Sequence, residues 1–241
     1  MTSTIAIIGK SGSGKTTVAT AMYKLIRRKF PTSSVLLIDN DLTLELSESF
    51  GIKSRNTIYG IKSGKHEYKT GIPDGMSKQE FIEWALEDII FEADEYTDVI
   101  ASWLVTPKDC ICPSTRIMRE ALKKLVQRYD FAIFDCEYDL KYLNSLIDIP
   151  IDETVIVSKS SNASISLASK IYDSSKKYAC EGKLEILLNK VKKEHINEAM
   201  GIINALELDL IGCIEKYENK DDIVKVLEVF YSRMNLPQSK D

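Results

Sequence analysis

Long hydrophobic runs are missing from this sequence. No segment approaches the roughly 18 uninterrupted apolar residues that a membrane-spanning helix needs. The first residues also lack the charged stretch and following apolar run that are typical of a secretory signal. We therefore expect a cytoplasmic protein that has no membrane as a partner.

Cysteine, histidine and excess positive charge are also scarce. Five cysteines among 241 residues, without a secretory signal, indicate reduced thiols rather than a disulfide scaffold. The only histidines, His66 and His195, are interpreted as solvated surface residues rather than ligands. The net charge of −4 argues against nucleic acid as a partner, because surfaces that bind nucleic acid are rich in lysine and arginine.

Short apolar runs alternate along the chain with segments of helical spacing. Nearly continuous apolar runs are typical of strands buried on both faces, and they occur at 4–8, 35–38, 98–103, 131–134, 154–157, 185–188 and 210–214. Helical spacing predicts helices at 16–29, 79–92, 114–128, 164–178 and 221–234. Repeated strand–helix units predict an α/β fold in which a mostly parallel central sheet carries helices on both faces.

The chain offers no clear boundary between domains. Its 241 residues suffice for one sizeable α/β domain and are few for two. Because no repeat, low-complexity block or linker divides it, the sequence predicts a single domain over 1–241. A polar, glycine-bearing segment at 53–78 is predicted to be an irregular insertion, and the tail at 237–241 is predicted to fray.

A glycine-rich turn follows the first predicted strand and opens the first predicted helix. It matches the complete P-loop pattern, which here comprises Gly9, Lys10, Ser11, Gly12, Ser13, Gly14, Lys15, Thr16 and Thr17. Glycines let such a loop turn its backbone N–H groups toward phosphate oxygens, and the helix N-terminus adds its positive end. Lys15 is placed to reach the outer phosphates and the Thr16 hydroxyl to coordinate Mg²⁺. The sequence therefore predicts binding and hydrolysis of a nucleoside triphosphate.

Three aspartates stand at or just beyond the ends of predicted strands. Ligands of parallel sheets bind at the carboxyl ends of the strands, where a carboxylate can hold Mg²⁺. We interpret Asp135 in this way, with a turn-capping role as the alternative. Asp39 and Asp41 supply further carboxylates at the same edge, or form a turn signature. Asn189 and Lys190 follow a later strand and could present an amide to the base of the nucleotide.

Two cysteines, Cys110 and Cys112, are separated by one residue. Two thiolates at this spacing can bind one soft or borderline metal ion but supply only two ligands, whereas Zn²⁺ and Ni²⁺ usually take about four. A two-fold dimer would bring two such pairs together and complete the set. The residues alone leave open whether these are two ordinary, partly buried thiols.

The lysine after the first P-loop glycine narrows the class of nucleotide-binding protein. Lys10 resembles the signature lysine of the deviant Walker A ATPases, which include MinD, ParA and the nitrogenase iron protein. The resemblance implies a SIMIBI-type fold and a homodimer around ATP, in which Lys10 reaches across to the partner's nucleotide. The usual motif has two glycines after this lysine, whereas this chain has Ser11 and Gly12.

Other motifs of the same class match this chain in order. The class carries an Asp-x-Asp after its second strand, which Asp39 and Asp41 match, and a Walker B aspartate, which Asp135 matches. The resemblance implies that Asp39 supports the Mg²⁺ shell and that Asp41 positions the attacking water. It also implies that Asn189 and Lys190 contact the base and that the nucleotide is ATP.

Within this class the CooC family fits best. Cys110 and Cys112 before a predicted helix, together with the run at 134–143, resemble CooC, the ATPases that serve nickel insertion into carbon monoxide dehydrogenase. The resemblance implies a Ni²⁺ or Zn²⁺ site shared across the dimer interface, with carbon monoxide dehydrogenase or a related metalloenzyme as the client. One departure is Asp139, which replaces a switch glycine and puts the rate of hydrolysis in question.

Three functions therefore compete. The leading hypothesis is an ATP-dependent homodimeric metallochaperone, in which dimer closure changes the geometry of Cys110 and Cys112. The first alternative is a ParA/MinD-like partitioning or positioning ATPase; the negative net charge and the lack of a basic amphipathic segment at 223–241 argue against it. The second is a small-molecule P-loop kinase, which would give no role to Lys10 or the cysteine pair.

Overall fold

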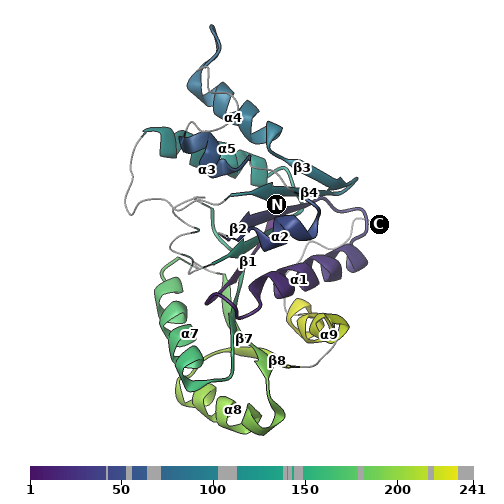
Figure 1. The fold of residues 1–241 in the computed structure, drawn as a ribbon, viewed down its shortest axis with the longest axis vertical. Helices are drawn as coiled ribbons and strands as arrows, with labels where there is room; N and C mark the ends of the chain where they lie inside the picture. The colour runs from purple at the N-terminus through teal and green to yellow at the C-terminus, as the bar shows by residue number, and fades with distance from the viewer. Residues whose placement is uncertain are drawn as a thin grey trace.

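A central sheet organises the protein (Figure 1). The computed structural model describes residues 1–41, 43–52, 56–63, 72–102, 113–137, 140, 143, 149–178, 182–216 and 220–232. Within these residues the strand order is β3-β4-β2-β5-β1-β6-β7-β8. The strands are β1 (Ser3–Ile8), β2 (Val35–Asn40), β3 (Phe91–Asp94), β4 (Thr97–Ala101), β5 (Phe131–Cys136), β6 (Glu153–Ser158), β7 (Lys183–Val191) and β8 (Leu210–Glu215).

All neighbouring strands run parallel except β3 and β4, which pair antiparallel at one edge. Parallel neighbours need crossover connections, and helices among the described residues supply several of them. The helices are α1 (Lys15–Lys29), α2 (Glu45–Ser49), α3 (Ile58–Ser63), α4 (Lys78–Asp88), α5 (Pro113–Val126), α7 (Asn162–Ser175), α8 (Ile196–Ala205) and α9 (Lys220–Tyr231), and a 3-10 turn, Lys193–His195, precedes α8. The predicted α/β fold with a mostly parallel sheet is confirmed.

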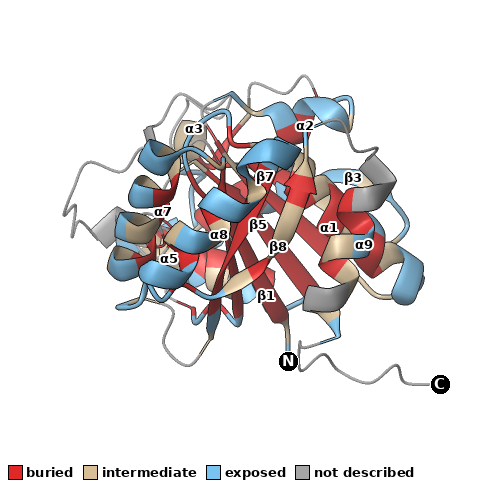
Figure 2. Ribbon diagram, turned by 90° about the horizontal axis from the view of Figure 1, so that it is seen from below, coloured by how far each residue is buried: buried red, intermediate tan, exposed pale blue. Residues whose placement is uncertain are grey.

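Two hydrophobic cores lie on opposite faces of the sheet. One joins alternate strand residues to α3, α4, α5, α7 and α8, and the other joins the remaining strand residues to α1, α2 and α9. Figure 2 shows the strands buried between these two helical layers. The strands read as continuous apolar runs because both of their faces are covered. In the described part of the chain, no helix is long and apolar enough to cross a membrane.

Some predicted boundaries and elements were wrong. The helix predicted at 79–92 ends at Asp88, and β3 begins at Phe91 and pairs with β4 across a tight turn. The segment predicted to be irregular at 53–78 contains α3, while 53–55 and 64–71 lie outside the described residues. No helix was predicted where α2 and α8 form. These short helices are stabilised by packing against the sheet, since short helices are marginal by themselves.

The parallel register brings several strand ends together at one edge of the sheet. Asp39 at the end of β2 pairs in register with Asp135 at the end of β5. The glycine-rich loop after β1 lies between β5 and β6 at the same edge, because β1 is hydrogen-bonded to both. Residues that are far apart in the sequence therefore meet where ligands of parallel sheets bind.

Candidate nucleotide-binding site

The loop between β1 and α1 has the conformation of a phosphate cradle. Gly9, Gly12 and Gly14 have φ angles of 139°, 74° and 98°, a region that glycine adopts without strain. A Cβ at Gly9 would lie 2.4 Å from the carbonyl oxygen of Val157 in β6, so a larger residue would collide there. The N–H of Ser13 donates to the Lys10 carbonyl over 3.1 Å. The glycines of the predicted P-loop thus stand where the backbone requires them.

Lys15 at the start of α1 is paired with the second aspartate of the Asp-x-Asp motif. Its Nζ lies 3.4 Å from Asp41 Oδ2, and the two side chains are only 4% and 10% exposed. Asp41 Oδ1 accepts hydrogen bonds from the Thr43 N–H over 3.0 Å and the Thr43 hydroxyl over 2.9 Å. Charges attract strongly where water is excluded, so a phosphate that approaches Lys15 competes with Asp41.

Thr16 and Asp135 form the second contact between the P-loop and the strand ends. The Thr16 hydroxyl donates to Asp135 Oδ2 over 2.7 Å. Burial raises the pKa of Asp135 to about 7, because the charged carboxylate is shielded from water. Asp135 Oδ1 is buried, and no described residue donates a hydrogen bond to it. A buried carboxylate with a free oxygen beside a threonine hydroxyl offers the hard oxygen donors that suit Mg²⁺.

Asp39 is fully buried and is bonded to the chain that follows it. Its Oδ2 accepts the Ser47 N–H over 2.7 Å and its Oδ1 accepts the Asp41 N–H over 3.3 Å. Burial raises the pKa of Asp39, while these N–H groups act in the opposite direction. The first aspartate therefore anchors the start of α2 against β2. Its predicted part in the Mg²⁺ shell remains a prediction.

Asn189 at the end of β7 supports the P-loop. Its Nδ2 donates to the Ser13 carbonyl over 2.8 Å, and its Oδ1 accepts the Lys190 N–H over 2.9 Å. A Cβ at Gly14 would lie 2.3 Å from Asn189 Nδ2, which shows how closely the amide packs on the loop. Lys190 has a φ of 58°, a conformation that is uncommon for a residue with a side chain. Contact of this pair with a base remains a prediction.

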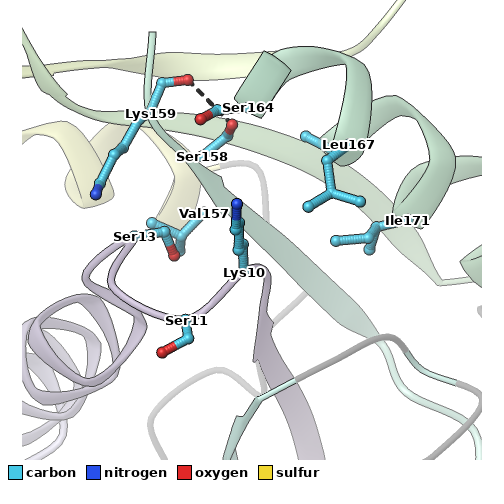
Figure 3. A pocket seen from close by; sticks show the side chains of 10 residues that line it. Lys10, Ser11, Ser13, Val157, Ser158, Lys159, Ser164, Leu167 and Ile171 are labelled. Atoms are coloured by element: carbon cyan, nitrogen blue, oxygen red, sulfur yellow. Dashed lines mark hydrogen bonds between the residues drawn. The ribbon is translucent and has the colours of Figure 1, made fainter. Parts of the chain in front are cut away.

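Lys10 is exposed, whereas Lys15 on the same loop is buried. Lys10 borders a hollow of about 70 Å³ that also involves Ser11, Ser13 and Lys159. Figure 3 shows Lys10 rising from the loop into this hollow, while Lys159 extends from the end of β6 toward the loop. No ion pair joins either lysine to a residue that the structure describes. The loop thus has one lysine turned inward and one turned outward.

Sequence reasoning missed Lys159. It follows the end of β6 at the ligand-binding edge of the sheet, which is the same signal that identified Asp39 and Asp135. A search for cations after predicted strands, in addition to carboxylates, would have found it.

The predicted metal residues Cys110 and Cys112 lie outside the described residues, as does Asp139. Among the residues that are described, no group of three or more histidine, cysteine, aspartate and glutamate side chains is arranged to hold a metal ion. The cysteine pair as a Ni²⁺ or Zn²⁺ site therefore stays a prediction.

Comparison with known proteins agrees with this site. A family model described as an AAA domain matches residues 2–187. An uncharacterized ATP-binding protein of Methanocaldococcus jannaschii is 27% identical over 215 residues, which cover 86% of this chain and 82% of that protein. A second uncharacterized ATP-binding protein of the same organism is 23% identical over 218 residues, which cover 87% of this chain and 84% of that protein.

Solved structures share the fold. A plasmid partition protein from Borrelia burgdorferi superposes with a TM-score of 0.68 at 20% identity, covering 97% of this chain and 99% of that chain. The Pyrococcus furiosus cell division ATPase MinD gives 0.64 at 20% identity, covering 96% and 99%. The MinC:MinD complex of Aquifex aeolicus gives 0.68 at 15% identity, covering 99% of each chain. These similarities establish a P-loop NTPase fold of the MinD and ParA type.

Proposed function

The chain belongs to the AAA domain family, whose model matches residues 2–187, and we propose that it is an ATP-driven dimerisation switch. The proposed switch is of the ParA/MinD-like kind. It would bind ATP with Mg²⁺, form a homodimer around the nucleotide and hydrolyse it slowly. Two observations support this proposal. The Methanocaldococcus jannaschii relative is described as an ATP-binding protein, and the partition and cell-division proteins share the fold. All residues of the chain would form one switch domain.

The observation that carries the proposal is the contrast between Lys10 and Lys15. Lys15 is buried and turned toward the strand ends, where it meets Asp41. Lys10 is exposed on the same loop, and no described residue pairs with it. One lysine thus suits the phosphates of its own subunit and the other those of a second subunit. A small-molecule kinase that works as a monomer would have no use for the outward lysine.

The residues suggest an order of events. The outer phosphates of ATP take Lys15 from Asp41, and Asp41 becomes free to orient a water molecule for in-line attack. Thr16 and Asp135 would hold Mg²⁺, which would supply positive charge to the phosphate oxygens. Lys10 crosses the interface and stabilises the charge that develops on the transferred phosphate of the other subunit. Loss of that phosphate removes the contact, and the dimer opens.

The test measures molar mass and ATP turnover together. Light scattering should show a monomer without nucleotide and a dimer with Mg²⁺ and a slowly hydrolysed ATP analogue. Lys10→Ala should still bind ATP but should lose the dimer and hydrolyse ATP more slowly by about tenfold or more. Lys24→Ala is the matched control, since Lys24 is exposed on α1 and forms no described ion pair. A wild type that stays monomeric with the ATP analogue would refute the dimerisation switch, and a dimer that is unchanged in Lys10→Ala would refute the role of Lys10 at its interface.

The similarity to MinD structures also suggests how such a switch would be used. A partner protein is part of the MinC:MinD complex of Aquifex aeolicus. We propose that the ATP-bound dimer of this chain likewise recruits a protein partner and that hydrolysis releases it. Pull-down of a candidate partner should succeed with the ATP analogue and fail with ADP.

The metal-insertion hypothesis ranked first on sequence, and the comparisons favour the ParA/MinD alternative over it. The motifs that place the chain in the deviant Walker A class do not separate its members. Only the cysteine pair and the run at 134–143 resemble CooC in particular, and of these only Cys110 and Cys112 would bind the metal. Titration of Zn²⁺ and Ni²⁺ against the wild type and Cys112→Ser tests it, and metal binding unaffected by the substitution would exclude a role for the pair.

A further inference from the structure

Lys159 occupies a position beside the P-loop that no motif assigns. It is the first residue after β6, whose Val157 carbonyl lies against Gly9. The Ser158 hydroxyl donates to the Lys159 carbonyl over 3.1 Å, and Ser161 caps the N-terminus of α7 just beyond. The backbone that carries Lys159 is therefore held from both sides, against the loop and against the helix.

The Lys159 ammonium lies over the middle of the cradle. A Cβ built at Gly12 would stand 3.8 Å from Lys159 Nζ. The side chain is exposed, and no described carboxylate forms an ion pair with it. Figure 3 shows it extended from the end of β6 toward Ser13. A cation with three donors thus stands close to the P-loop, whose backbone N–H groups are expected to bind phosphate oxygens.

We propose that Lys159 binds the terminal phosphate of the ATP held by its own P-loop and so discriminates ATP from ADP. This inference rests on the proposed function. The helix end of the cradle, with Thr16 and Thr17, serves the inner phosphates, and Lys15 reaches the outer ones. Gly12 comes two residues before Gly14, the N-cap of α1, so we place a cation above it at the outer end of the nucleotide.

Charge gives the reason for a further lysine. Three aspartates stand at the strand ends next to the loop, namely Asp39, Asp41 and Asp135, and Asp41 already forms an ion pair with Lys15. The terminal phosphate adds negative charge to this acidic neighbourhood. Lys159 approaches from β6, which lies on the other side of β1 from β2 and β5. Its charge offsets the repulsion between the terminal phosphate and the aspartates, which Lys15 cannot fully offset while it also pairs with Asp41. ADP lacks the phosphate that would meet it.

The experiment compares ATP and ADP affinities by titration calorimetry in the presence of Mg²⁺. Lys159→Ala should weaken ATP binding by about tenfold and ADP binding by less than about twofold, the range expected for one hydrogen bond to a charged group. Lys159→Arg should retain most of the preference for ATP. Lys170→Ala, an exposed lysine farther along α7 with no described ion pair, should leave both affinities unchanged. Thermal unfolding without nucleotide checks that each variant is folded.

The outcomes are distinguishable. Equal weakening of ATP and ADP, or no weakening of either, in a folded Lys159→Ala protein would overturn the role of Lys159 and leave the proposed switch standing. Failure of the wild type to bind ATP would overturn the proposed function and this inference with it. A selective loss of ATP affinity, restored by arginine, would establish Lys159 as a residue that reads the terminal phosphate.

Discussion

The Lys15 ammonium lies 3.4 Å from the Asp41 carboxylate. This contact ties the start of α1, directly after the glycine-rich loop, to the segment after β2. The pair joins a phosphate-binding residue to the residue that we assign to orient water. Nucleotide binding and the position of Asp41 are thereby coupled, since Lys15 cannot bind a phosphate at full strength while it holds Asp41.

We expect Asp41→Asn to lower the free energy of unfolding by about 3 kcal/mol without nucleotide, because it leaves the buried Lys15 ammonium without its counter-charge. Saturating Mg²⁺ and ATP should recover most of this loss, since phosphate takes over the pairing. Urea denaturation with and without nucleotide measures both values. Asp173→Asn, at an exposed position on α7, is the control. An equal loss with and without nucleotide would contradict the competition between Asp41 and phosphate.

Two glycine substitutions separate backbone strain from steric conflict. Gly75 has a φ of 82° and open space around it, so Gly75→Ala should cost about 1–2 kcal/mol of unfolding free energy. Gly9→Ala adds a Cβ 2.4 Å from the Val157 carbonyl oxygen and should cost more than about 3 kcal/mol. Denaturant unfolding compares the two variants directly. Similar costs would mean that the loop moves away from β6 easily.

The stability of the protein should fall as the pH rises toward 8. Burial raises the pKa of Asp135 from 3.8 to about 7 and that of Glu153 from 4.5 to about 7, so the folded protein retains protons that the unfolded chain releases. This stabilisation is fully present below the unfolded pKa values and is lost as the pH passes through about 7.

Asp135→Asn tests this assignment, because its neutral amide cannot release a proton. Between about pH 5 and pH 8 the wild type should lose roughly 2–4 kcal/mol more than the variant in urea denaturation without nucleotide. Glu153→Gln should remove a separate part of the slope, since Glu153 stands at the opposite end of the sheet. An unchanged slope in Asp135→Asn would show that Asp135 is ionised throughout this range.

Asn189→Ala distinguishes support of the P-loop from recognition of the base. The substitution removes the hydrogen bond to the Ser13 carbonyl, and we expect ATP and GTP affinities to fall together, by about tenfold, as the loop loses its support. Competition binding with both nucleotides measures the ratio. A change in the ratio of ATP to GTP affinity would instead assign Asn189 to the base, as its resemblance to the Asn-Lys motif implies.

Much of this fold follows from local pattern. Strands such as β1, β2 and β6 are covered on both faces, so their apolar runs stand out in the sequence. Short elements whose formation depends on tertiary packing were not predicted from the sequence. The four-residue β3 forms because it pairs with β4. In the sequence alone, residues 91–92 continue the helical spacing of α4, so the helix was predicted to extend through them. The short α2 begins with the Ser47 N–H bonded to Asp39, a contact between elements that periodicity does not reveal.

The P-loop was determined by the sequence itself, because a phosphate cradle is made from consecutive residues whose glycines and lysine carry the chemistry. Only the tertiary structure decided which side chains surround it. Thr16 bonds to Asp135 across 119 positions and Asn189 to the Ser13 carbonyl across 176, while Lys159 lies over Gly12. These contacts depend on β1 lying between β5 and β6, which is set by packing of the whole sheet. The sequence shows that several residues stand at strand ends, but strand order decides which of them meet.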